Sequence, residues 1–266
     1  SVVTIPVNGS IYGGITGPLN NITGTAYDGT SGIVGNSVVV AIREEWGNQM
    51  YWDPIASTFS ASGIIWSTAS VSGAGSTKDW TWRVPTLISG STYSVMSKAT
   101  DYAMNTEIRF TTVTFRFDRS SPTAVISVPV NNRHYNSITQ ITGTASDNMG
   151  ISANSIQYAI KENNPVGCWW DGGSSFTVSG TDPNWLTANN SAAGAGDVTW
   201  STGSLVFKTN YEYLVKVKAI DTAGNWQLGT DKVFVYDTDL PTATVITPTN
   251  GQSFNALTTV SGHYYD

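Results

Sequence analysis

The chain has 266 residues, of which 40% are hydrophobic and only 12% charged, and its net charge is −6. The negative charge comes mainly from aspartate, and an acidic surface argues against nucleic acid or an anionic membrane as a partner. The single cysteine, Cys168, excludes a disulfide within the chain and a cysteine-based metal site, and we expect it to be a small buried side chain. The sequence has no apolar run of membrane-spanning length, so no membrane insertion of this segment is expected.

A repeat with a fixed period organises the chain. The segment 118–147 returns at 237–266, and a third version, slightly longer between Pro6 and its closing aspartate, occupies residues 1–28. The aspartates that close the three copies follow one another at intervals of 119 residues. A period of this length is typical of whole domains in tandem. We therefore predict three units, which are residues 1–118, residues 119–237, and residues 238–266 as the first two strands of a third unit.

Alternation of apolar and polar residues recurs throughout, whereas helical periodicity is hard to find. The alternation in 211–220 places Val215, Val217 and Ala219 on one face of a strand and Lys216 and Lys218 on the other, toward water. About seven such strands per unit, with frequent Gly, Asn and Ser turns, predict an all-β fold of antiparallel immunoglobulin-like sandwiches arranged end to end. In chain order, the clearest strand segments are 37–44, 110–118, 154–162, 211–220 and 231–237.

Several short segments recur in both complete units. They are GTAYD and GTASD, YWD and WWD, the tryptophan pairs 52/170, 66/185 and 82/200, and the loop AIDTAGN followed by the linker VYDTDLPT. With these segments the chain resembles the bacterial immunoglobulin-like repeats of large surface and adhesin-type proteins. The resemblance implies an extracellular, stalk-like or filamentous array, with calcium at the joints and neighbouring repeats of the same or another copy as partners. The first unit departs from the pattern at Met104, which replaces the glycine of the DTAGN loop and affects the turn geometry expected there.

The sandwich topology predicts a cluster of acidic residues at the joint between the first two units. Asp147 and Asn148 open the B–C loop, Asp221 and Asn225 lie in the F–G loop, and the linker brings Asp118 to the same end. Calcium takes about six to eight oxygen ligands, which such a cluster can supply. The alternative is that these residues only form turns, as Asp and Asn commonly do. The same reasoning predicts metal ligands Asp28, Asp101 and Asn105 at the head of the first unit, and Asp237, Asp239 and Asp266 at the head of the third.

The ten tryptophans suggest two roles. Those that recur in both units are expected to pack in the core or against loops. The alternative is an exposed aromatic platform for glycans, for which Trp169, Trp170 and Trp185 in the long segment 163–197 are the candidates. Four tryptophans have no counterpart in the other unit and are better candidates for surface contacts, namely Trp46, Trp80, Trp169 and Trp226.

Catalysis is not expected from this sequence. The chain has only two histidines, His134 and His263, and lacks the common nucleophile, metalloprotease and nucleotide-binding motifs. Asp53 and Asp171 both follow a tryptophan, but they belong to different units. The sequence thus predicts a non-catalytic structural segment of an extracellular bacterial surface protein, filament or adhesin stalk. The alternative is a glycan-binding accessory module that contacts glycans or a host surface. Residues 238–266 either belong to a longer array or complete a sandwich in a neighbouring copy.

Overall fold

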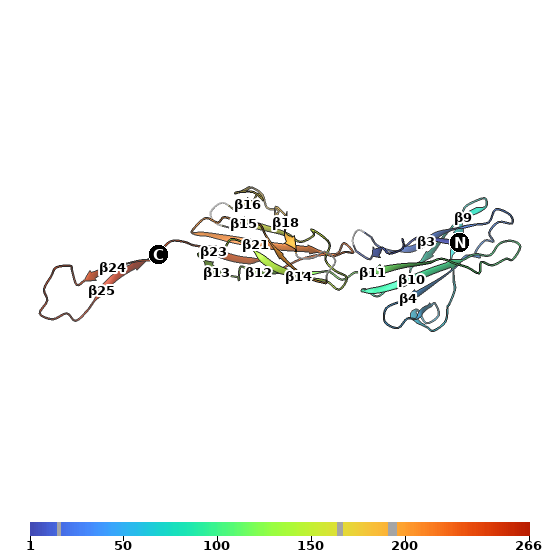
Figure 1. Ribbon diagram of the computed structural model, residues 1–266, viewed down its shortest axis with the longest axis horizontal. Helices are drawn as coiled ribbons and strands as arrows, with labels where there is room; N and C mark the ends of the chain where they lie inside the picture. Colours follow the sequence, from blue (N-terminus) through green and yellow to red (C-terminus); the bar gives the residue numbers. More distant parts are fainter. Residues whose placement is uncertain (15–16, 164–166, 191–195) are drawn as a thin grey trace.

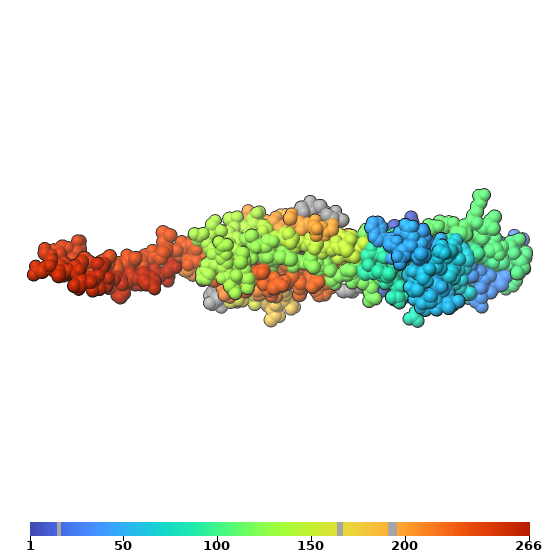
Figure 2. Space-filling model, turned by 90° about the horizontal axis from the view of Figure 1, so that it is seen from below, coloured from blue at the N-terminus to red at the C-terminus, as the bar shows by residue number. Residues whose placement is uncertain are grey.

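The chain folds into two β-sandwiches and a β-hairpin, which follow one another along one axis (Figure 1). The computed structural model describes residues 1–14, 17–163, 167–190 and 196–266. The space-filling view gives the same elongated outline (Figure 2). The all-β class with immunoglobulin-like sandwiches is thereby confirmed. Nothing in the described ranges forms a helix that could cross a membrane.

The first sandwich contains β1–β11. Its smaller sheet has the order β1-β3-β9-β8, with β1 (Val2–Ile5), β3 (Asn21–Tyr27), β9 (Thr77–Arg83) and β8 (Ser70–Ser72). Its larger sheet has the order β2-β11-β10-β4-β5-β6, and β7 also pairs with β4. These strands are β2 (Ile11–Tyr12), β11 (Thr112–Phe117), β10 (Ser91–Lys98), β4 (Val39–Glu44), β5 (Tyr51–Asp53), β6 (Thr58–Ala61) and β7 (Ser67–Thr68).

The second sandwich contains β12–β23 and repeats this plan. Its smaller sheet has the order β12-β14-β20-β19, with β12 (Thr123–Val128), β14 (Thr142–Ser146), β20 (Asp197–Ser201) and β19 (Asn189–Asn190). Its larger sheet has the order β13-β23-β21-β15-β16-β17, with β18 on β15 and β22 on β21. These strands are β13 (Arg133–Tyr135), β23 (Lys232–Tyr236), β21 (Tyr211–Ile220), β15 (Gln157–Glu162), β16 (Trp169–Trp170), β17 (Phe176–Val178), β18 (Leu186–Thr187) and β22 (Trp226–Leu228).

The described residues form more strands than the seven expected in each unit, in part because the first strand of each sandwich divides between the two sheets. β1 and β12 belong to the smaller sheets, and their continuations β2 and β13 pair in parallel with the last strand of the larger sheets. A bulge and then a proline, which has no N–H to donate, interrupt the ladder at the division. The terminal hairpin of β24 (Thr242–Thr247) and β25 (Ser261–Tyr265) has the same bulge. The prolines, all preceded by a cis peptide bond, are Pro6, Pro129 and Pro248.

Each sandwich buries its own core between the two sheets. In β21 the residues Val215, Val217 and Ala219 are fully buried, and the intervening lysines are not, as the alternation predicts. Each core contains a triplet of aromatic rings with neighbouring centroids 5.0–5.3 Å apart. The triplets are Trp52, Phe59 and Tyr93 in the first sandwich, and Trp170, Phe176 and Tyr213 in the second.

One tryptophan pairing expected from the sequence is wrong. Trp200 lies opposite Gly143 on β14, and its counterpart in the first sandwich is Trp80, which lies opposite Gly24 on β3. Trp82 lies two residues further along, opposite Ile22. Trp80 is therefore a recurring core residue and not a surface candidate, because the register of the strands fixes its partner.

Candidate functional site

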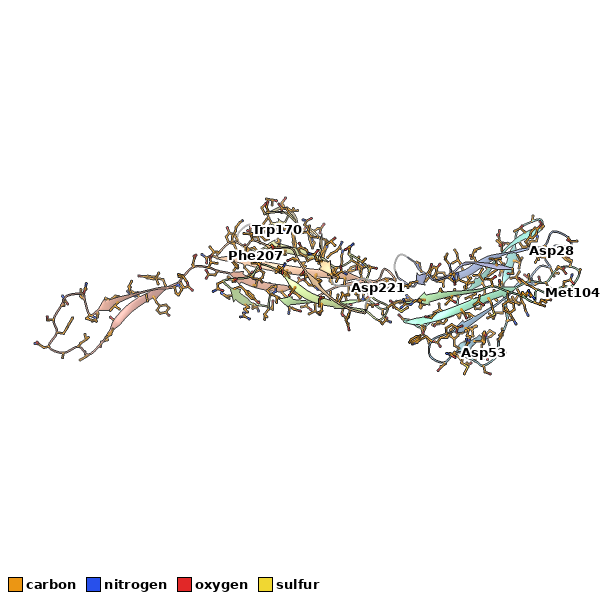
Figure 3. The ribbon with its side chains drawn as sticks, in the orientation of Figure 1. Asp28, Asp53, Met104, Trp170, Phe207 and Asp221 are labelled. Carbon is orange, nitrogen blue, oxygen red and sulfur yellow. The ribbon has the colours of Figure 1, made fainter. Side chains whose placement is uncertain are left out.

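Three carboxylates meet at the joint between the two sandwiches. Asp118 follows β11, the last strand of the first sandwich, whereas Asp147 follows β14 and Asp221 follows β21 in the second. Each residue offers one oxygen, and these three oxygens lie within 4.8 Å of one another. Figure 3 places Asp221 at the end of the second sandwich that faces the first. The cluster thus joins the linker to two loops of the following sandwich, as the sequence predicted.

The loop after β21 holds Asp221 in a network with Asn225. Oδ1 of Asp221 accepts hydrogen bonds from the backbone N–H groups of Ala223 and Asn225, both at 2.8 Å. Oδ2 of Asp221 accepts one from the Asn225 side-chain amide, also at 2.8 Å. The same amide donates to the backbone oxygen of Asp118 at 3.2 Å. Asn225 therefore ties the linker to the loop, and only its Oδ1 remains as a ligand atom.

Asp118 is fully buried but only partly satisfied. Its Oδ1 accepts hydrogen bonds from the Ser89 hydroxyl at 2.8 Å and from the Ser120 N–H at 2.9 Å. Its Oδ2 is buried and has no hydrogen-bond partner among the described residues. A buried carboxylate oxygen without a partner is costly, since it has lost its water and gained nothing in return. This oxygen fits a cation ligand.

The electrostatic surroundings of the cluster are unfavourable for three ionised carboxylates. Burial raises the pKa of Asp147 and of Asp221, and the charge of Asp118 adds to the increase at both. The four ion pairs among the described residues lie elsewhere in the chain. Arg116 lies in β11, close to Asp118 in sequence, but its Nη2 is directed at the Met149 sulfur, 2.8 Å away. A bound cation would supply the missing positive charge.

Two glycines allow close backbone contacts at the joint, Gly14 with the second sandwich and Gly13 with the backbone of the linker residue Asp118. Gly14 lies so close to the loop after β21 that a Cβ at this position would be 2.0 Å from the Ala223 oxygen. A Cβ on Gly13, whose φ is +122°, would be 2.3 Å from the Asp118 oxygen. The sequence signal for this contact is the extra length of the first copy of the repeat, but its meaning could not be read before the fold was known.

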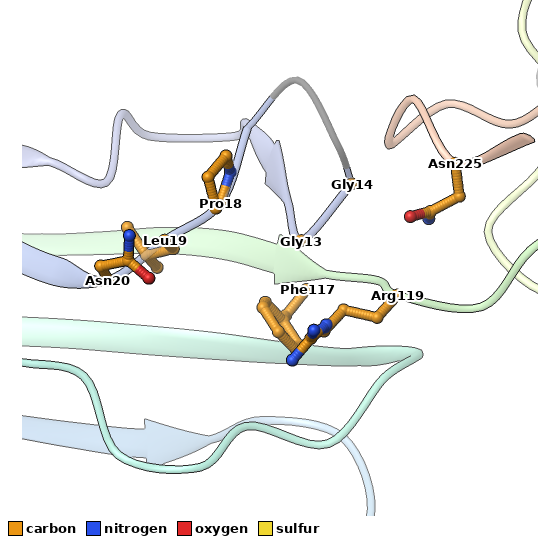
Figure 4. A pocket seen from close by; sticks show the side chains of 8 residues that line it. All are labelled: Gly13, Gly14, Pro18, Leu19, Asn20, Phe117, Arg119 and Asn225. Carbon is orange, nitrogen blue, oxygen red and sulfur yellow. The ribbon is translucent and has the colours of Figure 1, made fainter.

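Two hollows of the surface lie beside the cluster. A cavity of about 350 Å³ is bordered by Gly13, Gly14, Arg119 and Asn225, together with Pro18, Leu19, Asn20 and Phe117 (Figure 4). On another side of the joint, Asp147 and Asn148 line a more open hollow. Asn148 packs over Gly90, since its Nδ2 lies 2.8 Å from the position of a Cβ there.

The other two predicted sets are not assembled into a three-carboxylate cluster among the described residues. At the free end of the first sandwich, where Figure 3 labels Asp28, the side chains of Asp28 and Asp101 both bond to Ser31. The Asn105 amide donates to Asp101, as Asn225 does to Asp221. No third carboxylate joins these residues within the part of the chain that the structure describes.

At the far end of the second sandwich, Asp237 and Asp239 are engaged in the linker itself. Oδ1 of Asp237 accepts hydrogen bonds from Thr209 and from the N–H of Asp239, and Oδ2 of Asp239 accepts one from Asn210. Asp266 is exposed after β25, and the three residues form no carboxylate cluster among the described residues. These three residues therefore lack part of the set that meets at the first joint.

Met104 does not change its turn. Its φ is +69°, close to the +86° of its counterpart Gly224, and its N–H bonds to the Asp101 oxygen as that of Gly224 bonds to Asp221. The loop thus keeps its form although a side chain at positive φ is strained. The adjacent hydrogen bonds of Asp101 to Asn105 hold it in place.

The alternative of an aromatic platform in segment 163–197 is not supported at Trp169 and Trp170. They are only 2% and 3% exposed, so neither can stack on a sugar ring. Trp185 is partly exposed, but the Lys218 ammonium lies 4.8 Å from its ring centroid, as Lys98 lies 4.4 Å from Trp66. Residues 164–166 and 191–195 of this segment lie outside the described residues. Of the candidates for surface contact, Trp46 and Trp226 are exposed.

The acids that follow Trp52 and Trp170 are turn residues. Asp53 accepts hydrogen bonds from the N–H groups of Ile55 and Ala56. Asp171 accepts them from three successive residues, Gly173 to Ser175. Asp53 and Trp170 lie on different sandwiches (Figure 3), so these acids do not form a pair.

Comparisons with known proteins find similarity of fold only. No family model and no curated protein matches the sequence. A solved tetra-tandem repeat from the extending region of a large adhesion protein is 19% identical over 87% of this chain and 48% of its own, with a TM-score of 0.32. A marsupial T cell receptor is 10% identical over 90% and 75%, with a TM-score of 0.35. The FN1–FN3 domains of chicken CNTN1 are 13% identical over 88% and 65%, with a TM-score of 0.32. This chain spans about half the length of the first of these proteins, and scores of this size support no statement about function.

Proposed function

We propose that this chain is a non-catalytic structural segment of an extracellular surface protein, in which sandwiches in line form a spacer, stalk or filament. We further propose that a calcium ion at the joint holds the two sandwiches in a fixed orientation. The observation that carries the proposal is the cluster of Asp118, Asp147 and Asp221, which come from both sides of the joint and have oxygens within 4.8 Å of one another.

The chemistry of the cluster favours a hard cation over turn formation alone. Turn formation accounts for Asp221, because its own loop supplies hydrogen bonds to both of its oxygens. It does not account for Oδ2 of Asp118, which is buried without a partner among the described residues. Carboxylate and carboxamide oxygens are the ligands that calcium prefers, and Asn225 and Asn148 stand next to the carboxylates as further donors. The three carboxylates take part in none of the ion pairs found among the described residues, which leaves a negative charge that a divalent ion would offset.

The proposed role of the ion is mechanical. Asp118 belongs to the linker, and the other two carboxylates belong to separate loops of the second sandwich. An ion that binds all three connects the linker to both loops, and it removes the repulsion that otherwise favours their separation. The joint would then resist bending, and the chain would keep the elongated form of Figure 1.

The test is to measure thermal unfolding and small-angle X-ray scattering of the intact chain with calcium and with a chelator. We expect calcium to raise the melting temperature and to narrow the distribution of interdomain distances, and we expect the Asp118→Asn variant to lose both responses. The variant preserves size and the Oδ1 acceptor while removing the charge. Identical melting and scattering with calcium and chelator would contradict the metal site, and a bent or variable chain under both conditions would contradict the rigid spacer.

A further inference from the structure

A serine hydroxyl in the loop before β10 holds the linker between the two sandwiches. Oγ of Ser89 accepts hydrogen bonds from the backbone N–H groups of Arg119 at 2.8 Å and of Ser120 at 3.1 Å. The same hydroxyl donates to Oδ1 of Asp118 at 2.8 Å, since an ionised carboxylate can only accept. Ser89 therefore connects a loop of the first sandwich to the backbone of the linker and to one carboxylate of the three-carboxylate cluster.

These bonds fix the orientation of the Asp118 carboxylate. Its Oδ1 accepts from the Ser89 hydroxyl at 2.8 Å and from the Ser120 N–H at 2.9 Å. Asp118 is 0% exposed, and its Oδ2 has no hydrogen-bond partner among the described residues. A turn of the carboxylate away from this orientation would break both bonds to Oδ1. The unpartnered oxygen is therefore held in one place beside the other two carboxylates of the cluster.

The second sandwich repeats this arrangement with a threonine in the loop before β21. Oγ1 of Thr209 accepts a hydrogen bond from the Thr238 N–H at 2.9 Å and donates to Oδ1 of Asp237 at 3.3 Å. The N–H of Asp239 donates to the same oxygen at 2.9 Å. A threonine thus fits this place as well as a serine does. The surroundings differ, because Asp237 is partly exposed and joins no three-carboxylate cluster among the described residues, whereas Asp118 is buried within one.

We propose that Ser89 is a positioning residue of the joint, whose hydroxyl raises the affinity for calcium by holding the Asp118 carboxylate with Oδ2 free for the ion. This inference rests on the calcium site proposed above. Groups that hydrogen-bond to metal ligands orient them, and their loss weakens metal binding by about 10- to 100-fold. A ligand that is already oriented loses little conformational freedom when the ion binds. Ser89 therefore contributes to calcium binding without being a ligand itself.

The test measures the calcium affinity of the intact chain by isothermal titration calorimetry, with the melting temperature in chelator as a second readout. The Ser89→Ala variant lacks the hydroxyl, and its dissociation constant for calcium should be about tenfold larger. The Ser89→Thr variant keeps the hydroxyl in the form that Thr209 shows, and it should bind calcium as the natural chain does. Ser120→Ala is the matched control, because it removes a hydroxyl 2.9 Å from that of Ser89 but keeps the N–H that bonds to Asp118. Its affinity should not change.

Weaker binding by Ser89→Ala together with normal binding by Ser89→Thr supports the proposal. If Ser89 only satisfied the linker backbone, Ser89→Ala would melt earlier in chelator and bind calcium as before, and this result would overturn the proposal but not the calcium site. Equal losses of affinity in Ser89→Ala and Ser120→Ala would also overturn it. A natural chain that does not bind calcium would contradict the proposed function itself. Should Ser89→Ala not fold, Ser89→Cys replaces it, since a thiol donates more weakly, and an unchanged affinity of that variant overturns the proposal.

Discussion

Asp101 and Asp221 have the same loop and the same hydrogen bonds, but their pKa values are displaced in opposite directions. In both loops the asparagine four residues later donates its backbone N–H to Oδ1 and its side-chain amide to Oδ2, each at 2.8 Å. At Asp101 these bonds, led by the Asn105 side chain, lower the pKa. At Asp221 burial at the joint outweighs them, and together with the charge of Asp118 it raises the pKa.

The difference follows from the environment of the loop and not from its sequence. Asp101 lies at the open end of the first sandwich, where water solvates the carboxylate. Asp221 lies under the preceding sandwich, whose linker removes that water and adds a second carboxylate. The same loop therefore forms only a turn at one end of the molecule, whereas at the joint it contributes a carboxylate to a candidate cation site.

Asp221→Asn and Asp101→Asn form a matched pair for the metal site. With calcium at about 100 times its dissociation constant, binding to the folded chain stabilises it by about 2.7 kcal/mol. We expect the Asp221→Asn variant to lose this stabilisation and the Asp101→Asn variant to retain it, because Asp221 belongs to the three-carboxylate cluster and Asp101 does not. Thermal unfolding with calcium and with chelator measures both, and an equal loss of the calcium response in the two variants would contradict the assignment.

Gly14→Ala should loosen the joint without unfolding either sandwich. The new Cβ would lie 2.0 Å from the Ala223 backbone oxygen. Relief of such an overlap should destabilise the contact between the two sandwiches by about 1–3 kcal/mol. Small-angle scattering should show a wider range of interdomain distances, while the melting temperatures of the sandwiches stay the same. Gly17→Ala is the control, since a Cβ there meets nothing within 4 Å. A Gly14→Ala chain with unchanged scattering would show that the contact does not set the orientation.

Trp170→Ala should destabilise the second sandwich strongly. Its ring is 3% exposed and packs on Phe176 at a centroid distance of 5.0 Å, so truncation leaves a large cavity and costs about 3–5 kcal/mol. Trp46→Ala should change stability by no more than about 0.5 kcal/mol, because Trp46 is 72% exposed. Denaturant unfolding gives both values. Similar small effects of the two substitutions would argue that Trp170 is not a core residue.

Alkaline solution should destabilise the second sandwich through Tyr213. Burial raises the pKa of this phenol to about 12, from an ordinary value of 10.0. The folded state therefore holds its proton more tightly than the unfolded state. This contribution to stability is complete below pH 10 and is lost as the pH rises through about 12.

Tyr213→Phe separates this titration from general alkaline denaturation. The variant should lose less stability than the natural chain between these pH values. Near neutral pH it should be less stable by about 1 kcal/mol, because the N–H of Lys208 loses its acceptor, the Tyr213 hydroxyl at 2.8 Å. Circular dichroism across the pH range, with tyrosinate absorbance in parallel, measures both effects. An identical pH profile for the two chains would assign the alkaline transition to other groups.

Much of the candidate site could be predicted because it depends on topology. In the topology of the sandwich, β14 and β21 end at the same end of the molecule, and the repeat places a linker there. Asp118, Asp147 and Asp221 therefore meet. The partners of Asp118 could not be predicted. Ser89 lies in a loop before β10, and nothing in its local sequence separates it from the many other serines of the chain.

The sequence by itself determined the repeat, the sandwich class and the acidic residues of the joint, because a period of 119 residues and an alternation of two are properties of the chain alone. Only the tertiary structure decided whether Trp169 is buried. Glycines and serines follow it in the sequence and it has no counterpart in the first unit, yet in β16 it is only 2% exposed. Asp28 and Asp147 end the same motif, yet of these two described residues Asp147 alone meets two further carboxylates, because the linker and the packing of the first sandwich bring Asp118 to its loop.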